Sequence, residues 1–154
     1  MKVEQFEYKP LSHYSYVLVS NGEMAIIDFV SSHLQIHKET GATIYNSEKL
    51  GAEYPHQSFD EGDSITIGKA SLHAINTPGH SPDSITIVAK EGDKTILFTG
   101  DTLFIGDVGR PDLREKAGNM KTKCQELAKA MYHSIQEKFT DLPDDAIVYP
   151  AHGA

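Results

Sequence analysis

Residues 70–102 read ASLHAINTPGHSPDSITIVAKEGDKTILFTGDT, and this stretch decides the fold. It contains three runs that are rich in β-branched or alternating apolar residues, at 70–75, 84–88 and 94–98. Such runs predict β-strands, because alternation at period two places the apolar side chains on one face. The last two runs flank Glu91-Gly92-Asp93, a spacing that is typical of a hairpin.

The same pattern continues outside this stretch. Four more strands are expected, at 14–19, 24–28, 64–67 and 146–149. Asn21-Gly22 separates the first two of these strands and is a strong short-range signal for a hairpin. Gly68-Lys69 separates the third from the strand that begins at residue 70, which predicts another hairpin.

Two helices are expected between the strands. Ser31 or Ser32 can cap the first, which runs through Lys38 and stops before Gly41. The second covers about 120–139 and carries an apolar face at spacings of three and four: Cys124, Leu127, Met131, Ile135 and Phe139. Hairpins with interspersed helices predict the α/β (α+β) class, as a layered sandwich rather than a parallel βαβ sheet.

Length, charge and cysteine count exclude several classes of protein. The 154 residues contain no repeat or linker, so 1–154 is expected to form a single domain. A formal net charge of −8 argues against a nucleic-acid partner. No apolar run reaches the ~20 residues of a membrane span and no signal peptide opens the chain, so a soluble cytoplasmic protein is expected. The single cysteine, Cys124, excludes an internal disulfide and a cysteine-based zinc site.

A turn that carries one metal-binding head group follows three of the strands. These turns are Thr77-Pro78-Gly79-His80, Thr99-Gly100-Asp101-Thr102 and Pro150-Ala151-His152-Gly153. If the three strands lie side by side, His80, Asp101 and His152 converge at one edge of the sheet. Two imidazoles and a carboxylate suit Zn²⁺, or a non-haem Fe²⁺ with open positions. Each residue alone is more typical of a turn or a cap, but all three together at strand ends favour a site.

These motifs resemble those of a known superfamily. The segments TPGH at 77–80, TGDTLF at 99–104 and PAHG at 150–153 are similar to the later signature motifs of the metallo-β-lactamase superfamily. The run GDTLFIGDVGRPDL at 100–113 looks like one branch, the persulfide dioxygenases (sulfur dioxygenases), which are often fused to rhodanese domains. The resemblance covers nearly the whole chain and implies an αββα sandwich.

The chain departs from this family's pattern at one place. Members carry an H-x-H-x-D-H motif, or a variant that ends in Phe, just before the segment that begins here at Val30, whereas Asp28 is followed directly by Phe29. About 30 residues, one helix-plus-strand crossover, are therefore expected to be missing between 28 and 29, together with the first metal-binding histidine. The sandwich is expected to be incomplete for this reason. A truncated C-terminus is also expected after Ala154, because chain ends fray and would hold His152 poorly.

The resemblance implies roles for individual residues. His80 and Asp101 match two of the family's iron ligands, and the third belongs to the missing motif. His152 matches a late histidine, which binds a second metal in dinuclear hydrolases and lies beside the metal as an outer-sphere group in the mononuclear iron enzymes. The three are therefore the expected catalytic residues, with one Fe²⁺ per site and Zn²⁺ as the alternative.

The implied reaction is the oxidation of glutathione persulfide by O₂ to sulfite and glutathione. The first alternative is a glyoxalase II-like zinc thioesterase, although Phe29 stands where that class needs a histidine. The second is a non-catalytic scaffold that binds partners, which only the missing segment supports. A C-terminal rhodanese domain in the full protein and a homo-oligomer are further expectations.

The remaining polar residues receive simpler interpretations. Asp107, Arg110 and Asp112 either orient the metal ligands from outside or form a salt bridge that stiffens their loop. His33 and His37 are four residues apart but are expected on a solvated helix face. Cys124 is expected to be buried and inert, and Tyr14 and Tyr16 are expected in the core rather than in contact with substrate. The histidines expected to be structural or on the surface are His13, His56, His73 and His133.

Overall fold

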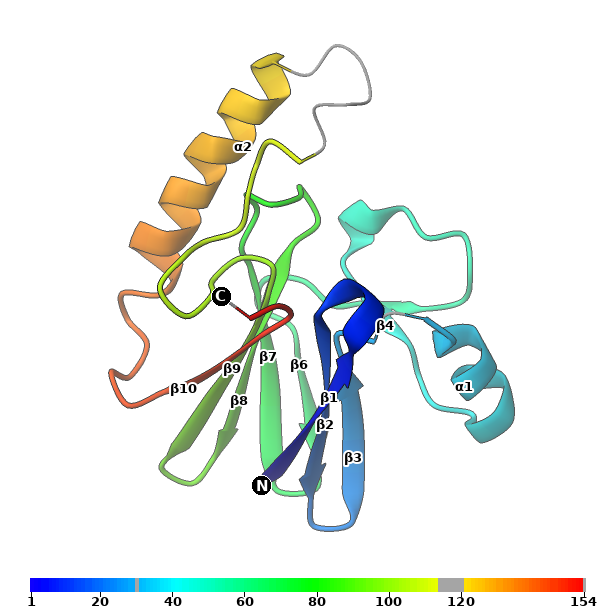
Figure 1. Ribbon diagram of the computed structural model, residues 1–154. Coiled ribbons are helices and arrows are strands. Elements are labelled where there is room, and N and C mark those ends of the chain that lie inside the picture. The colour runs from blue at the N-terminus through cyan, green and yellow to red at the C-terminus, as the bar shows by residue number, and fades with distance from the viewer. Residues whose placement is uncertain (30, 114–120, 154) are drawn as a thin grey trace.

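The computed structural model describes residues 1–29, 31–113 and 121–153, and only the backbone of 121–123. Two β-sheets face each other, with helices outside them (Figure 1). The strands are β1 (Lys2–Tyr8), β2 (His13–Ser20), β3 (Glu23–Ile27), β4 (Tyr45–Asn46), β5 (Gln57–Ser58), β6 (Ser64–Ile67), β7 (Ala70–Asn76), β8 (Ile85–Glu91), β9 (Lys94–Gly100) and β10 (Ile147–Pro150). The helices are η1 (Lys9–Leu11), α1 (His33–Thr40), η2 (Glu48–Leu50), α2 (Lys121–His133) and the π-helical turn η4 (Ser134–Lys138). The predicted layered α/β class is confirmed.

Strands β1, β2 and β3 form an antiparallel three-stranded sheet. The β2–β3 turn has Asn21 at φ 48° and Gly22 at φ 85°, the left-handed pair that a tight hairpin needs, as the sequence predicts. Strand β1 was not expected from the sequence pattern. Its residues are almost all exposed and polar ones interrupt the apolar ones, so it carries no clear strand pattern.

The second sheet has five strands in the order β10-β9-β8-β7-β6. All neighbours are antiparallel except β10 and β9, which are parallel because the chain crosses over through α2. Strands β7, β9 and β10 therefore run in one direction and end at the same edge. A separate two-stranded parallel pair joins β4 to β5.

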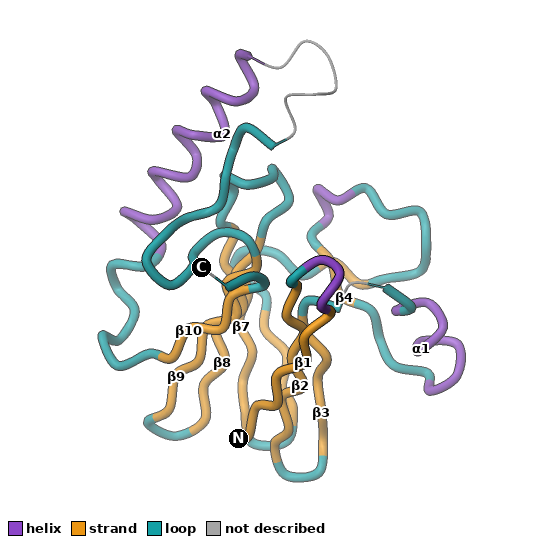
Figure 2. Tube along the Cα trace, in the orientation of Figure 1, coloured by secondary structure: helices purple, strands orange, loops and turns teal. Residues whose placement is uncertain are grey.

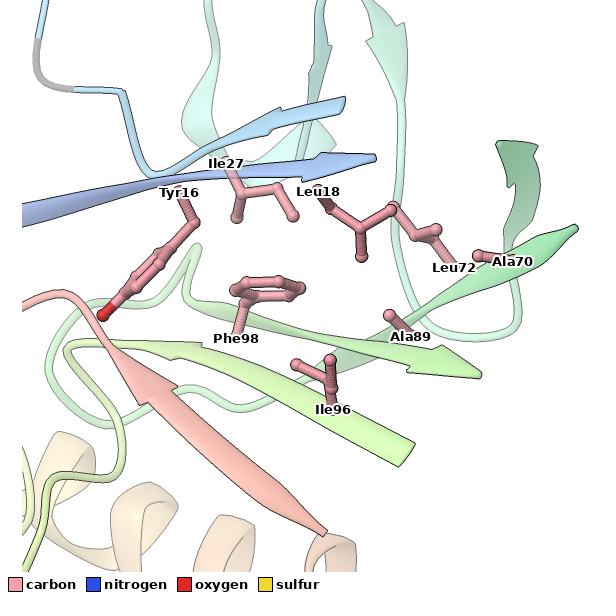
Figure 3. Packing of buried hydrophobic residues seen from close by; sticks show 8 residues of the cluster. All are labelled: Tyr16, Leu18, Ile27, Ala70, Leu72, Ala89, Ile96 and Phe98. Carbon is pink, nitrogen blue, oxygen red and sulfur yellow. The ribbon is translucent and has the colours of Figure 1, made fainter. Parts of the chain in front are cut away.

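The core fills the space between the two larger sheets. The three-stranded sheet contributes Tyr16, Leu18 and Ile27, and the five-stranded sheet contributes Ala70, Leu72, Ala89, Ile96 and Phe98 (Figure 3). The rings of Tyr16 and Phe98 lie 5.4 Å apart across this layer. Tyr16 is fully buried, which agrees with the expectation that it lies in the core.

Helix α2 lies on the outer side of the five-stranded sheet (Figure 1). Val88 and Leu97 are buried on that side, and Met131 of the helix is buried as well. Cys124 is half-buried on the same helix. Residue 120, where the sequence predicts the helix to start, lies outside the described residues. Among the described helices, none combines the length and the apolarity that a bilayer crossing requires.

The junction between β3 and α1 has an unusual backbone. Asp28 and Ser32 both have a positive φ, of 55° and 68°, which non-glycine residues seldom adopt. Ser32 occupies the N-cap position of α1, as predicted. Its side chain makes no capping hydrogen bond, so the predicted stabilisation by a serine side chain is wrong. Gly41 ends the helix in the left-handed conformation, as predicted. Helix α1 buries none of its residues, so it does not cover the three-stranded sheet as an outer layer.

Tyr16 links the two sheets through its hydroxyl group, which donates a 2.5 Å hydrogen bond to the Pro150 carbonyl. We expect Tyr16→Phe to lower the free energy of unfolding by about 1–3 kcal/mol, because the buried Pro150 carbonyl loses its donor. Urea unfolding measures this, with Tyr132→Phe, at a position 64% exposed, as the control. Equal stabilities for the two variants would contradict the assigned role.

Candidate metal and catalytic site

The edge of the five-stranded sheet brings the three predicted site residues together. His80 follows β7, Asp101 follows β9 and His152 follows β10, and these strands all end at the same edge. Figure 2 shows the loops after these strands gathered at the upper edge of the sheet. Strand β8 separates β7 from β9, so the strands are not immediate neighbours, but the loops close the distance.

Asp101 lies between the two imidazoles. Its Oδ2 atom is 3.7 Å from Nε2 of His80, and its Oδ1 atom accepts a 2.5 Å hydrogen bond from Nδ1 of His152. The first distance is too long for a hydrogen bond but is compatible with two ligands that each bind one ion at ~2.0–2.2 Å. The side chains are 22%, 26% and 34% exposed for His80, Asp101 and His152, so a small molecule can reach them.

A buried network of threonine hydroxyl groups fixes the two loops that carry His80 and Asp101. The Oγ1 atom of Thr77 lies 3.0 Å from that of Thr86 and 3.1 Å from that of Thr102. Thr99 donates to the Leu103 carbonyl at 2.6 Å. All four threonines are fully buried, so these hydrogen bonds satisfy groups that water cannot reach.

Gly109 closes the loop that follows Asp101 directly against the site. Its N–H donates to the Thr102 carbonyl at 3.0 Å. A Cβ atom at this position would lie 1.7 Å from the Asp101 carbonyl oxygen and 3.1 Å from Cβ of His80. Only glycine fits this close approach without moving the Asp101 backbone or the His80 side chain.

The C-terminal histidine is held from both sheets. Ala151 donates to the Gly100 carbonyl at 2.9 Å and accepts from the Tyr14 N–H at 2.6 Å. The Pro150 carbonyl accepts from Tyr16 as described above. These contacts fix the backbone next to His152, so the expectation that it would be poorly held at the chain end is wrong.

Two residues that the sequence analysis did not select also lie at the site. His13 packs its ring against that of His152, with centroids 5.0 Å apart and planes at 87°. Asp28 is half-buried, and its Oδ2 atom is buried without a hydrogen-bond partner. Asp28 ends a strand much as Asp101 does, which could have marked it, whereas no local signal marks His13 because its contacts depend on the packing of the two sheets.

Burial raises the pKa of Asp28 to about 7, and the nearby Asp101 charge raises it further than the His152 imidazole lowers it. The folded protein therefore keeps a proton on Asp28 up to about pH 7, whereas the unfolded chain releases it near about pH 4. The contribution of Asp28 to the free energy of unfolding is therefore present at low pH and is lost as the pH rises to about 7. The loss is at most about 1.4 kcal/mol for each pH unit.

Asp28→Asn is expected to remove this part of the pH dependence in the metal-free protein. Urea unfolding at several pH values between about 4 and 8 measures the difference between the wild type and the variant. That difference should shift in favour of the variant as the pH rises to about 7 and then level off. Parallel curves would show that Asp28 titrates normally in the folded state.

The other predicted polar residues make local contacts. Arg110 forms a two-point ion pair with Asp112 at 2.6 and 3.0 Å, and both side chains are solvent-accessible. Asp107 accepts from the Val108 N–H at 2.8 Å. The Arg110–Asp112 pair matches the salt-bridge alternative, in which the residues stiffen the loop, whereas the Asp107 side chain bonds to its neighbouring amide. The side chains of His33 and His37 make separate contacts: the His33 ring packs on Tyr54, and Nδ1 of His37 bonds to the Ala42 carbonyl. Both residues are half-buried rather than on a fully solvated helix face.

The donor set fits part of a metal site. His80 and Asp101 can occupy neighbouring positions around one divalent ion, and Nδ1 of His80 is buried without a partner. Within residues 1–29, 31–113 and 121–153, no group of three or more donors has the geometry to hold a metal. Of the described residues, His80 and Asp101 are the pair placed so that they can share one ion, and a third protein donor would have to come from elsewhere.

A comparison with protein families decides the family. The model of the metallo-beta-lactamase superfamily matches residues 29–152, which contain all three predicted site residues. The chain belongs to the metallo-beta-lactamase superfamily. Membership indicates a metal-dependent enzyme and agrees with the two-sheet fold and with the resemblance noted in the sequence.

Two individual relatives and one solved structure of this superfamily are similar to the chain. The mitochondrial persulfide dioxygenase ETHE1 of Homo sapiens is 31% identical over 88% of this chain and 52% of its own length. The probable metallo-hydrolase YqgX of Bacillus subtilis is 37% identical over 64% of this chain and 42% of its own length. The crystal structure of a metallo-beta-lactamase from Staphylococcus aureus superposes with a TM-score of 0.86 and 30% identity, over 99% of this chain and 56% of that one. The chain spans about half the length of the curated persulfide dioxygenases that it matches.

Proposed function

We propose that this metallo-beta-lactamase chain belongs to a mononuclear iron persulfide dioxygenase, which oxidises glutathione persulfide to sulfite with O₂. One observation carries the proposal: Asp101 directs one carboxylate oxygen toward His80 and gives the other to His152. In this arrangement His152 hydrogen-bonds to Asp101, which suits an outer-sphere role for His152 beside a single metal. The human relative supports the same activity.

His80 and Asp101 would hold the Fe²⁺ ion through Nε2 and Oδ2. When bound, the iron supplies adjacent coordination positions for the terminal sulfur of the persulfide and for O₂. The protein holds the two ligands rigidly through the buried threonine network and through Gly109. The 22% to 34% exposure of the three side chains leaves the site open to its substrates.

His152 handles protons in the proposed reaction. One persulfide, one O₂ and one water give one thiol, one sulfite and two protons, so a proton acceptor is needed beside the metal. The Asp101 carboxylate can only accept hydrogen bonds, so Nδ1 of His152 carries the hydrogen and donates a hydrogen bond to it. This leaves Nε2 of His152 to accept a proton from the substrate or from water.

The third metal ligand would come from a segment between residues 28 and 29 that this chain lacks. The two left-handed residues at this junction, Asp28 and Ser32, support the proposal, since non-glycine residues seldom adopt this strained conformation. The absence of a third donor among the described residues also supports it. Mass spectrometry of the intact natural protein tests it: a mass of 17.0 kDa would show that the short connection is the native one.

The wider setting is part of the same proposal. We propose that the full protein is cytoplasmic, forms a homo-oligomer and carries a rhodanese domain after the present chain. A rhodanese domain transfers sulfane sulfur and would supply or consume the persulfide next to the iron site. The resemblance of residues 100–113 to the rhodanese-fused branch supports this arrangement.

Oxygen uptake tests the function. The protein loaded with Fe²⁺ under anaerobic conditions is mixed with glutathione persulfide and air-saturated buffer, and O₂ consumption and sulfite are measured together. We expect sulfite to appear in equal amount to the O₂ consumed, and we expect His80→Ala to abolish both. His73→Ala, a change at an exposed histidine away from the site, is the matched control. Because two ligands hold iron weakly, the assay is run on both the present chain and the natural full-length protein.

A zinc-dependent hydrolase is the second candidate, since the Bacillus subtilis relative is a probable metallo-hydrolase. The two candidates differ in metal content and product. One iron per chain with sulfite formation supports the dioxygenase, whereas two zinc ions with thioester hydrolysis and no O₂ uptake support the hydrolase. Iron bound in the full-length protein without any O₂ uptake would overturn the proposal.

A further inference from the structure

We infer that His13 is a positioning residue of this site, which ties the turn at Asp28 to the imidazole of His152. The proposal rests on the proposed function for its significance, because His152 is the proton acceptor there. His13 stands at the start of β2 in the three-stranded sheet, whereas His152 follows β10 of the other sheet. The contact between His13 and His152 therefore joins the two sheets at the edge of the site.

The first contact of His13 holds the backbone of Asp28. Its Nε2 atom lies 2.7 Å from the Asp28 carbonyl oxygen and donates to it, because a carbonyl only accepts. Ser15 donates to the same oxygen at 2.8 Å. Asp28 has a φ of 55°, a left-handed conformation that non-glycine residues seldom adopt. Two donors on one carbonyl hold the Asp28 backbone in this conformation.

The second contact of His13 orients His152. The two rings meet edge to face, with centroids 5.0 Å apart and planes at 87°, and the two backbones form an isolated β-bridge. Asp101 holds His152 at Nδ1, but a single hydrogen bond leaves the ring free to rotate about it. The His13 ring restricts that rotation from one side, and the Phe104 ring lies near His152 as well, with centroids 6.4 Å apart and planes at 89°. Together the contacts direct Nε2 of His152 in one direction.

The His13 side chain makes both the hydrogen bond to the Asp28 carbonyl and the ring contact with His152. Different substitutions at His13 remove one or both of these contacts. Phenylalanine keeps a ring beside His152 but cannot donate to Asp28, whereas alanine removes both contacts. Ser15→Ala is the matched control, because it removes the other hydrogen bond to the Asp28 carbonyl and leaves the rings untouched. His73→Ala controls for the loss of a histidine at an exposed position.

The test is NMR of the metal-free 154-residue protein, with the exchange rate of the hydrogen-bonded His152 Nδ1–H proton as the readout. We expect His13→Ala to speed this exchange about tenfold, and we expect His13→Phe, Ser15→Ala and His73→Ala to leave it within about twofold of wild type. Backbone amides around Asp28 should exchange faster in His13→Ala, His13→Phe and Ser15→Ala, but not in His73→Ala.

Two results would overturn the inference. One is an unchanged His152 proton in His13→Ala; the other is an equal effect in Ser15→Ala, which would show that the turn and not the ring contact controls His152. If His13→Ala does not fold, His13→Leu replaces it, and a His152 proton that exchanges as in His13→Phe would be contrary evidence. The readout needs no metal and no turnover, so a failure of O₂ uptake would overturn the proposed function and leave this inference intact.

Discussion

Asp101→Ala is expected to abolish sulfite formation and to weaken Fe²⁺ binding by at least about 100-fold. The substitution removes the carboxylate oxygen that faces His80 and also the acceptor that holds His152. It leaves two imidazoles with no negative charge between them to offset the charge of the ion. Because even groups that only support a ligand change metal affinity by about 10–100-fold, the loss of a ligand itself should exceed that range.

Equilibrium dialysis against Fe²⁺ in the absence of oxygen, together with O₂ uptake, checks this expectation. Asp93→Ala is the matched control, because it removes an exposed carboxylate in the β8–β9 turn, at the opposite end of the same strands. The control should bind iron and turn over as the wild type does. Equal iron affinity in the Asp101 variant would mean that the ion binds elsewhere and that the proposed site is wrong.

Gly109→Ala is expected to damage the site without touching any charged group. The added Cβ atom would overlap the Asp101 carbonyl and press on His80, so the loop or both ligands must move. We expect the free energy of unfolding to fall by about 1–3 kcal/mol, the usual cost of adding a methyl group to a packed position. Iron affinity should fall by about tenfold, since both ligands share this contact.

Gly106→Ala is the matched control, which distinguishes backbone strain in the loop from a steric clash with the metal ligands. Gly106 has a φ of 84° and open space around its Cβ position, so alanine there strains the same loop without contacting His80 or Asp101. Urea unfolding should show a cost for both variants, whereas only Gly109→Ala should lose iron affinity. An equal loss of affinity in both would show that loop rigidity matters and the close contact at Gly109 does not.

The sheets could be predicted from the sequence because their signals are local. β-branched alternation marks the strands between residues 64 and 100, and Asn21-Gly22 marks the first hairpin. Strand β1 could not be predicted, because an exposed edge strand needs no apolar alternation. The predicted serine cap of α1 failed because Ser32 adopts a left-handed conformation and its side chain makes no capping hydrogen bond. This conformation belongs to the short connection to β3, and the residue preferences used to predict caps do not include such connections.

The site was only partly predictable. His80, Asp101 and His152 each follow a strand in a short turn, so their positions could be read from local motifs and their meeting from the sheet topology. His13 and Asp28 belong to the other sheet and reach the site only through packing between the layers. Such contacts depend on the relative placement of two sheets: the end of a strand marks Asp28 as a candidate, but no local signal marks His13.

Anomalous diffraction at the iron edge, from crystals of the protein loaded with Fe²⁺ under anaerobic conditions, tests the central claim most directly. The account predicts one peak per chain, at ~2.0–2.2 Å from both Nε2 of His80 and Oδ2 of Asp101. His152 should remain hydrogen-bonded to Oδ1 of Asp101 and stay out of the coordination sphere. A peak bound to His152 in place of His80, or His80 and Asp101 turned apart with no metal between them, would contradict it.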